Sequence, residues 1–333
     1  MEDATILKLA SRHYQSGVKD PLPFPLTEQW RNNRERMAEA IPKFTSAQEA
    51  VWWAQRSQNT GFDHRYQEVR ENERNVIAQK RILLEERFHG FDLDSSGFRE
   101  PDCSLPSSIH HLGRQVLLAV TTAGQGSPEY IKSIDPHGGV PVSNILFWHL
   151  NQYLSVVWQL RFRNLTVVEI GGGYGGLARL FVGENPRAFY SIVDLPESLF
   201  FAECYLRLSL PVSAAIAYAG CDSCPAIRAV KLSTPYRSGF SSVTYDVAVA
   251  AASLQEMEED AVRYWLSFVS RWANNFYSLN YASTPLVGDG AGLPERFLGP
   301  GWRRSKLERN PAVVTIDSKN DWVELLYVKG RNP

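Results

Sequence analysis

The segment Val167-Val168-Glu169-Ile170-Gly171-Gly172-Gly173-Tyr174-Gly175-Gly176-Leu177-Ala178 carries the strongest structural signal in the chain. An apolar run typical of a buried strand gives way here to a helical pattern, with closely spaced glycines between the two. Glycines allow a tight turn and let the backbone approach a ligand, and the first turn of the helix offers free N–H groups. Gly171, Gly173 and Gly176 have the G-x-G-x-x-G spacing of dinucleotide-binding loops, which alone is a weakly specific pattern.

Two acidic residues indicate which cofactor suits this loop. Glu169 precedes the glycines, where it would repel a pyrophosphate but attract a cofactor that carries an amino group and a sulfonium. Asp194 ends the next predicted strand, the position from which a carboxylate holds a ribose diol. The alternative role for Asp194 is to cap the helix that begins at Pro196. The pattern favours S-adenosylmethionine over a nicotinamide cofactor. The residues predicted to bind it here are Glu169, Gly171, Gly172, Gly173, Tyr174, Gly175, Asp194 and Leu195.

After about residue 160, short β-rich runs alternate with helical ones, a pattern typical of βαβ units around a parallel sheet. The predicted strands are Leu165–Ile170, Phe189–Asp194, Val212–Tyr218, Tyr245–Ala250 and Phe276–Tyr281, and the predicted helices are Gly175–Phe181, Pro196–Leu208 and Leu254–Ala273. Two further strands, Ala312–Asp317 and Trp322–Val328, are too close in sequence for a parallel crossover and must form an antiparallel hairpin. The predicted fold is therefore α/β: a Rossmann-like class I methyltransferase sheet of five parallel-type strands plus a C-terminal antiparallel hairpin.

The first half of the chain reads as a mainly helical and irregular region. Ser46 and Glu49 form a capping box that opens a short helix. Longer helices are predicted over Arg65–Phe88, Ile109–Ala123 and Val142–Leu160. We expect two domains: a helical region over residues 1–140 that covers the acceptor, and a cofactor-binding methyltransferase domain over residues 141–333.

Four motifs resemble those of one known family. V-V-E-I-G-G-G-Y-G-G-L-A, S-I-V-D-L-P-E-S, S-L-Q-E-M and F-Y-S-L-N-Y, all between about residues 140 and 330, are similar to segments of the sugar O-methyltransferases of bacterial polysaccharide and natural-product clusters. The first motif is shared by class I methyltransferases at large, and the last two are the motifs that make the chain resemble the sugar O-methyltransferase family in particular. The resemblance implies transfer of the methyl group to a sugar hydroxyl, with release of S-adenosylhomocysteine.

The loop after the fourth predicted strand should reach the reaction centre, because ligands of such sheets bind beyond the carboxyl ends of the strands, at the switch point. It supplies Ala252 and Ser253 for the cofactor, Gln255 for the substrate and Glu256 as a candidate general base. Ser253 and Glu256 also have the spacing of a capping box, which would turn the Glu256 side chain toward its own backbone. Both interpretations remain open at this point.

Histidine is the other common base, and the candidates are His110, His111 and His137, with His149 nearby in sequence. A metal-dependent mechanism is not expected, because Ala-Ala-Ser follows the fourth strand where paired aspartates would be needed. Asn280 and Tyr281, at the end of the fifth strand, are candidates to bind the sugar, although Asn280 would equally stabilise a loop.

Asp222, after the third predicted strand, would accept from the adenine amino group or else cap a helix over residues 223–230. The tryptophans of the N-terminal region, among them Trp30, Trp52 and Trp53, would stack on a sugar ring, but core packing is the favoured interpretation.

Composition limits the class of partner. The 333 residues include 35 basic and 36 acidic side chains, and this balance argues against a nucleic-acid partner and for a small or neutral substrate. The N-terminus resembles no signal peptide, no apolar run is long enough to span a membrane, and four cysteines are too few for a disulfide framework. We expect a cytoplasmic protein, with homo-oligomerisation left open. Cys221 and Cys224 are interpreted as ordinary loop residues.

Three other functions compete with sugar O-methylation. An NAD-dependent reductase would need a pyrophosphate beside Glu169 and would usually carry a Tyr-x-x-x-Lys pair, which is not evident. An N- or C-methyltransferase of a non-sugar metabolite, and a non-catalytic methyltransferase-like partner protein, are both compatible with the sequence.

Overall fold

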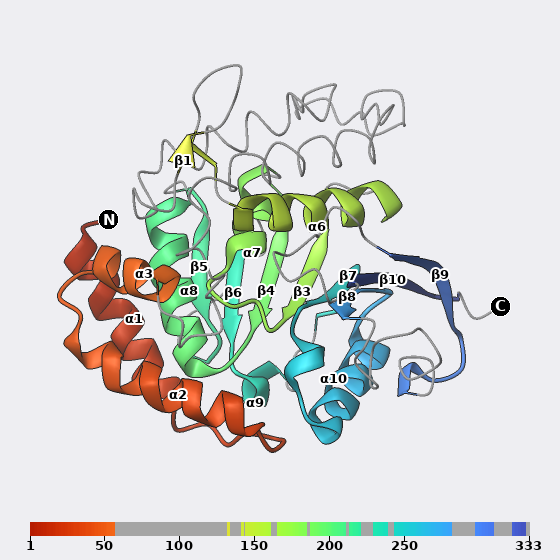
Figure 1. Ribbon diagram of the computed structural model, residues 1–333, viewed down its shortest axis with the longest axis horizontal. Helices are drawn as coiled ribbons and strands as arrows, with labels where there is room; N and C mark the ends of the chain where they lie inside the picture. Colours follow the sequence, from red (N-terminus) through yellow and green to blue (C-terminus); the bar gives the residue numbers. More distant parts are fainter. Residues whose placement is uncertain are drawn as a thin grey trace.

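The computed structural model of the chain describes residues 1–56, 132–133, 141–142, 144–160, 165–184, 187–210, 213–220, 229–238, 243–281, 297–309 and 322–330. A sheet crosses the middle of the molecule, with helices on both sides (Figure 1). Its strands are β3 (Thr166–Ile170), β4 (Phe189–Val193), β5 (Ala215–Tyr218), β6 (Ala229–Ser233), β7 (Val247–Ala251), β8 (Asn275–Tyr281), β9 (Trp302–Arg309) and β10 (Trp322–Lys329). The strand order is β5-β6-β4-β3-β7-β8-β10-β9.

The sheet is parallel from β5 to β8, and β10 enters antiparallel between β8 and β9. The strand order reverses at β3, whose two neighbours are β4 and β7. This is the topological switch point at which ligands of open α/β sheets bind. The predicted Rossmann-like class I methyltransferase fold is confirmed.

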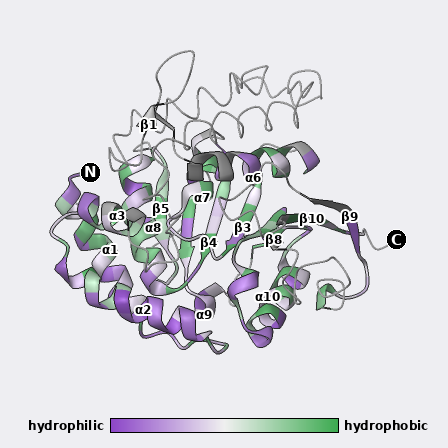
Figure 2. Ribbon diagram, in the orientation of Figure 1, coloured by the Kyte–Doolittle hydropathy of each residue, from purple (hydrophilic) through white to green (hydrophobic). Residues whose placement is uncertain are grey.

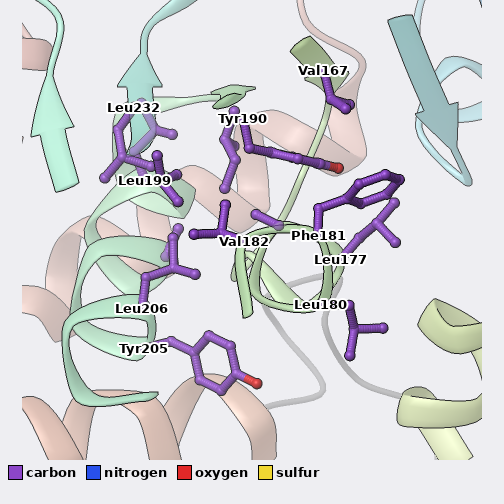
Figure 3. Close-up of a cluster of buried hydrophobic side chains, with 14 of the residues drawn as sticks. Val167, Leu177, Leu180, Phe181, Val182, Tyr190, Leu199, Tyr205, Leu206 and Leu232 are labelled. Carbon is purple, nitrogen blue, oxygen red and sulfur yellow. The ribbon is translucent and has the colours of Figure 1, made fainter. Parts of the chain in front are cut away.

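The middle strands are apolar because helices cover both faces, as parallel sheets require. β7 reads Val-Ala-Val-Ala-Ala, and its first four residues are buried. One core lies between the sheet and α6 (Asn144–Leu160), α7 (Gly176–Glu184) and α8 (Pro196–Ser209). Figure 3 shows part of it, where Leu177 and Phe181 of α7 and Leu199 and Leu206 of α8 gather around the strand residues Tyr190 and Leu232. The other core lies under α10 (Glu259–Trp272).

The N-terminal helices pack on the outside of α8. They are α1 (Asp3–Gly17), α2 (Glu28–Ala40), a 3₁₀ turn η1 (Ile41–Lys43) and α3 (Ala47–Arg56). Because the sheet lies on one side of α8 and these helices on the other, every residue from Pro196 to Leu206 is buried. The outer surfaces of α2 and α10 carry the hydrophilic residues (Figure 2).

Several local predictions are confirmed. Ser46 accepts from the Glu49 N–H at 3.0 Å at the start of α3, and α6 matches the predicted helix that ends at Leu160. Trp53 stacks on Phe201 in the core, as favoured for the tryptophans. A two-stranded antiparallel pair joins β1 (Lys132–Ser133) and β2 (Pro141–Val142). The predicted helices 65–88 and 109–123 lie outside the described residues, and the domain boundary near residue 140 stays a prediction.

The terminal hairpin pairs different segments from those expected. β10 matches the predicted second strand, but it pairs antiparallel with β8 on one side and with β9 on the other, where Val323 lies opposite Arg309. The predicted partner 312–317 lies outside the described residues. β9 reads Trp-Arg-Arg-Ser-Lys-Leu-Glu-Arg, and an edge strand of this kind has no apolar alternation to mark it.

A further strand was missed. Residues 229–230 were assigned to a helix after the third strand, but β6 begins at Ala229 and pairs in parallel with both β4 and β5. The alternating segment Ala-Val-Lys-Leu-Ser is short enough to fit either assignment, and its pairing partners decide in favour of a strand.

Candidate active site at the switch point

The glycine loop between β3 and α7 forms a close-fitting turn. Gly171, Gly173 and Gly175 have φ of 74°, 54° and 86°, the left-handed region that favours glycine. A Cβ on Gly171 would lie 2.5 Å from the Cβ of Ser253, on the loop after β7. The Gly171 N–H donates to the Val193 carbonyl oxygen at 2.9 Å, which ties the loop to the end of β4. The predicted loop therefore exists, and three strand ends meet around it.

Glu169 lies beneath the loop. Its side chain is buried, and Oε2 accepts a hydrogen bond from the Tyr190 hydroxyl at 2.9 Å. A Cβ on Gly172 would lie 2.8 Å from that same oxygen. Burial raises the pKa of Glu169 to about 8, and the negative charge of Asp194 adds to the increase. A carboxyl group buried in this way becomes more acidic when a cation binds beside it.

Asp194 connects the loop to α8. Its Oδ2 accepts from the Gly173 N–H at 2.8 Å and its Oδ1 accepts from the Leu195 N–H at 2.7 Å. Partial burial raises the pKa of Asp194 to about 6, and these two N–H groups lower it. The N-cap residue of α8 is Leu195, without a side-chain cap, so Asp194 does not cap this helix as its alternative interpretation required; it contacts the glycine loop and the residue before α8. A carboxylate has about four lone-pair positions, so these two bonds leave room for a diol.

The loop after β7 does not form the predicted capping box. The Ser253 hydroxyl donates to the Ile170 carbonyl oxygen at 2.7 Å, so it does not cap a helix. Residues 254–256 form only a 3₁₀ turn, η3 (Leu254–Glu256), and α10 begins at Glu259. The helix predicted over 254–273 is therefore wrong in its first turn, because Met257 and Glu258 have extended backbone. Ala252 has φ of 57°, a strained conformation for a residue with a Cβ.

Glu256 faces the site as a consequence. Its Oε2 accepts from the Trp30 indole N–H at 3.1 Å, across 226 residues of sequence. Burial raises the pKa of Glu256 to about 7, the Trp30 hydrogen bond lowers it, and the charge of Asp194 raises it. The capping alternative for Glu256 is wrong, because its carboxylate contacts the Trp30 indole and Ser253 makes no side-chain cap.

Asn280 stabilises the loop after β7 and is not exposed to a substrate. It is buried; its Oδ1 accepts from the Gln255 N–H at 3.4 Å and its amide donates to the Ser278 hydroxyl at 2.7 Å. These bonds hold η3 over the end of β8, which is the loop-stabilising alternative for Asn280. Gln255 is partly exposed on η3, and Tyr281 ends β8.

The strand end beside Asp194 belongs to β6. The Asp194 N–H donates to the Ser233 carbonyl oxygen at 3.2 Å, and Thr234 follows. The loop after β5, which was predicted to hold the adenine, is one strand further from the switch point. Asp222 itself lies outside the described residues, as do Cys221, His110, His111 and His137. His149, on α6, lies against the loop: a Cβ on Gly176 would be 2.1 Å from its ring.

An N-terminal strap, residues 17–34, crosses these strand ends. Asp20 pairs with Arg237 at 2.7 Å and accepts from the Thr234 hydroxyl at 2.6 Å, beside the end of β6. Phe24 then packs on Trp265 of α10. In Figure 1, α2 runs along the lower side of the sheet from α8 toward α9 (Pro235–Ser238) and α10.

The far end of the strap returns to α8. Arg34 donates to both carboxylate oxygens of the buried Glu197, at 2.9 and 3.0 Å. The sequence predicted an N-terminal cover but not its residues. Trp30 packs against the core, as favoured, and its indole N–H also reaches Glu256. The sequence signal for this inward face is the helical spacing of Trp30, Asn33, Arg34 and Met37.

The described residues offer neither a cluster of metal ligands nor a membrane-spanning helix. No group of three or more histidine, cysteine, aspartate or glutamate side chains in the described part of the chain is placed to hold a metal ion. Within those same residues, no helix is both long and apolar enough to cross a bilayer.

Comparisons with known proteins find similarity only among solved structures. No protein-family model matches the chain, and no curated protein matches it. Magnesium protoporphyrin IX methyltransferase (ChlM) from Synechocystis PCC 6803, solved with bound SAM, is 12% identical with a TM-score of 0.38, over 75% of this chain and 97% of that one.

Two further solved structures show the same level of similarity. A TehB-like SAM-dependent methyltransferase from Corynebacterium glutamicum is 12% identical with a TM-score of 0.38, over 53% of this chain and 86% of that one. The pyocyanin biosynthetic protein PhzM is 15% identical with a TM-score of 0.39, over 56% and 57%. At this level of similarity nothing about the site is inferred from these structures. The fold is assigned from the strand order described above.

Proposed function

We propose that this chain is an S-adenosylmethionine-dependent methyltransferase that methylates a hydroxyl of a sugar or glycosylated small molecule, with Glu256 as the general base. The observation that carries the proposal is the grouping of Glu169, Asp194 and Glu256 around the glycine loop at the switch point, where Asp194 acts electrostatically on both other carboxyl groups. Such a group favours a cationic ligand over a pyrophosphate.

The residues present fit this cofactor. The glycine loop is packed so closely against Ser253 and Glu169 that neither Gly171 nor Gly172 has room for a Cβ, which fixes its backbone at the switch point, where we expect a nucleoside to bind. Asp194 would hold the ribose hydroxyls, and Glu169 would stabilise the cationic end from beneath the loop. Ser233 and Thr234, at the strand end beside Asp194, are further candidates to border the adenine, and the role predicted for Asp222 stays a prediction.

When bound, the cofactor supplies an electrophilic methyl group. The chain's own contribution is to orient the acceptor and to remove its proton, since a neutral hydroxyl is a poor nucleophile. Oε1 of Glu256 would take that proton as the oxygen attacks, and the proton would leave to solvent after the product departs. A base of this kind suits an O–H acceptor better than a neutral amine, which can attack without prior proton loss.

The sugar acceptor rests on the motif resemblance, and a panel of acceptors tests it. The chain is incubated with methyl-labelled S-adenosylmethionine and separate nucleotide sugars, glycosides, amines and catechols, and label transfer is followed. We expect transfer to at least one sugar hydroxyl. Transfer to an amine alone would replace the O-methylation proposal. Cofactor binding without transfer to any acceptor would favour a non-catalytic partner protein, and absence of binding by calorimetry would overturn the whole proposal.

A further inference from the structure

One face of α2 is directed at the candidate active site. Trp30, Asn33, Arg34 and Met37 follow the i, i+3, i+4, i+7 spacing of a single helix face. Asn33 and Met37 are buried, and Trp30 is partly buried. Two positions of this stripe carry polar groups that reach carboxylates on other elements: Trp30 contacts Glu256 and Arg34 contacts Glu197. These polar contacts indicate that the inward face of α2 has a role at the site besides packing against the core.

The position of Trp30 is set from both sides. Thr27 caps α2, and its hydroxyl oxygen accepts from the Trp30 main-chain N–H at 3.3 Å. One turn later, the two-pronged contact of Arg34 with Glu197 fastens α2 to the first turn of α8. A paired guanidinium–carboxylate contact restricts geometry more than a single bond does. The indole is therefore held between two fixed points.

Trp30 is the one hydrogen-bond donor to the Glu256 carboxylate among the described residues. An indole N–H donates and never accepts, so it pairs with the oxygen without competing for the proton that a base must collect. The contact reaches Oε2 and thereby distinguishes the two oxygens of the carboxylate.

We propose that Trp30 is a positioning residue for Glu256, whose indole N–H fixes Oε2 and leaves Oε1 to receive the acceptor proton. The role of Glu256 as base rests on the proposed function, whereas the coupling between the two side chains does not. The donor that orients the base is therefore supplied by the N-terminal strap, which crosses the strand ends.

Besides burial, which raises it, two groups shift the pKa of the Glu256 carboxyl group, and they shift it in opposite directions. The Trp30 N–H stabilises the ionised form, and the charge of Asp194, at the end of β4, destabilises it. Loss of the Trp30 donor should therefore raise the pKa of Glu256 and reduce the fraction ionised at neutral pH.

A direct test follows the Trp30 indole N–H resonance by NMR over pH 5.5–8.5 in the full chain without cofactor or acceptor. The resonance is assigned as the indole signal missing from Trp30→Phe. We expect it to shift with a midpoint near the Glu256 pKa of about 7, and not to titrate there in Glu256→Gln. A resonance that is constant in the native chain, or that titrates equally in Glu256→Gln, would overturn the proposal. This readout requires no turnover.

Kinetics then give the catalytic consequence, with the acceptor found in the panel above. For Trp30→Phe, which keeps an aromatic ring but lacks the donor, we expect kcat to fall roughly tenfold at pH 7, the effect of one hydrogen bond to a charged group. The acidic limb of its pH–rate profile should move to higher pH, while cofactor affinity stays within about twofold.

The double variant Trp30→Phe/Glu256→Gln separates a positioning role from a structural one. It should be no slower than Glu256→Gln, because Trp30 acts through Glu256. An additive loss, or an unchanged pH limb in Trp30→Phe, would contradict the proposal. If the native chain shows the NMR titration but transfers no methyl group, the proposed function fails while the coupling of Trp30 to Glu256 stands.

Discussion

The Ser253 hydroxyl donates to the Ile170 carbonyl oxygen at 2.7 Å, and this bond joins the two loops that flank the switch point. Ile170 ends β3, and Ser253 follows β7, the neighbouring strand. The bond and the close approach of Gly171 to Ser253 hold the glycine loop against the loop that carries Glu256. The loop proposed to contact the cofactor and the loop that carries the proposed base are therefore held in one fixed arrangement.

Gly171→Ala should lose cofactor binding. The added Cβ would meet Ser253 at 2.5 Å in a backbone with φ of 74°, so both strain and collision oppose it. Gly299→Ala is the matched control, since Gly299 has φ of 80° and open space around it, and it should cost only about 1 kcal/mol of stability. We expect cofactor affinity to fall at least tenfold in Gly171→Ala alone, by calorimetry. Equal affinities in the two variants would show that the loop does not border the cofactor.

Asp194→Asn should weaken cofactor binding by about tenfold or more, because the ribose would lose an ionised acceptor. Asp246→Asn is the control, because Asp246 lies at the amino-terminal ends of the central strands, away from the switch point. Its carboxylate accepts from the Thr166 N–H and hydroxyl at 2.8 and 2.9 Å, so this change should lower the unfolding temperature and leave affinity unaltered. If Asp194→Asn binds the cofactor like the native chain, the ribose assignment is wrong.

Cofactor affinity should increase with pH from 6 to 7.5 through Glu169. Its pKa of about 8 in the empty protein means that the carboxyl is protonated in this range. A cation beside it favours the ionised form, so binding must release a proton and becomes easier as pH rises, by at most tenfold per pH unit. Calorimetry in buffers of different ionisation enthalpy measures that release. In Glu169→Gln the slope should be smaller, and an unchanged slope would assign the released proton to another group.

Glu256→Gln should reduce kcat by about 10²–10⁴-fold, the usual contribution of a general base, with little change in cofactor affinity. In the native enzyme kcat should rise with pH and level off above the pKa of about 7, because the ionised carboxylate is the active form. Glu258→Gln, two residues away on an exposed position, is the control and should retain full activity. Activity retained in Glu256→Gln would move the search for a base to the histidines.

Arg34→Gln should destabilise the fold by about 3 kcal/mol, the low end of the range for a broken buried pair, because Glu197 is buried while Arg34 is partly exposed. Arg263→Gln breaks a pair with Glu259 in which both side chains are about half exposed, so its effect should stay below about 0.5 kcal/mol. Urea unfolding of the two variants measures the difference. Equal effects would mean that the Arg34 contact does not fasten the strap.

Local sequence patterns predicted the features whose causes are local. Glycine spacing located the loop after β3, apolar runs located β3, β4, β7 and β8, and the position of Asp194 at a strand end placed it beside the loop. Patterns failed where two local interpretations compete. The spacing of Ser253 and Glu256 fits a capping box as well as it fits a role at the reaction centre. The contacts with the Ile170 carbonyl oxygen and the Trp30 indole, both distant in sequence, exclude the capping box.

By itself, then, the sequence determined the Rossmann-like sheet, the switch point and the carboxylates that border the glycine loop, because strand apolarity, glycine spacing and strand-end position are read along the chain. Tertiary structure alone decided which strand pairs with β10, that β6 lies between β4 and β5, and that Trp30 meets Glu256 across 226 residues. Those outcomes depend on pairing partners and on helix packing, which bring distant segments together. The helical spacing along α2 indicates an inward face, but not which residue that face meets.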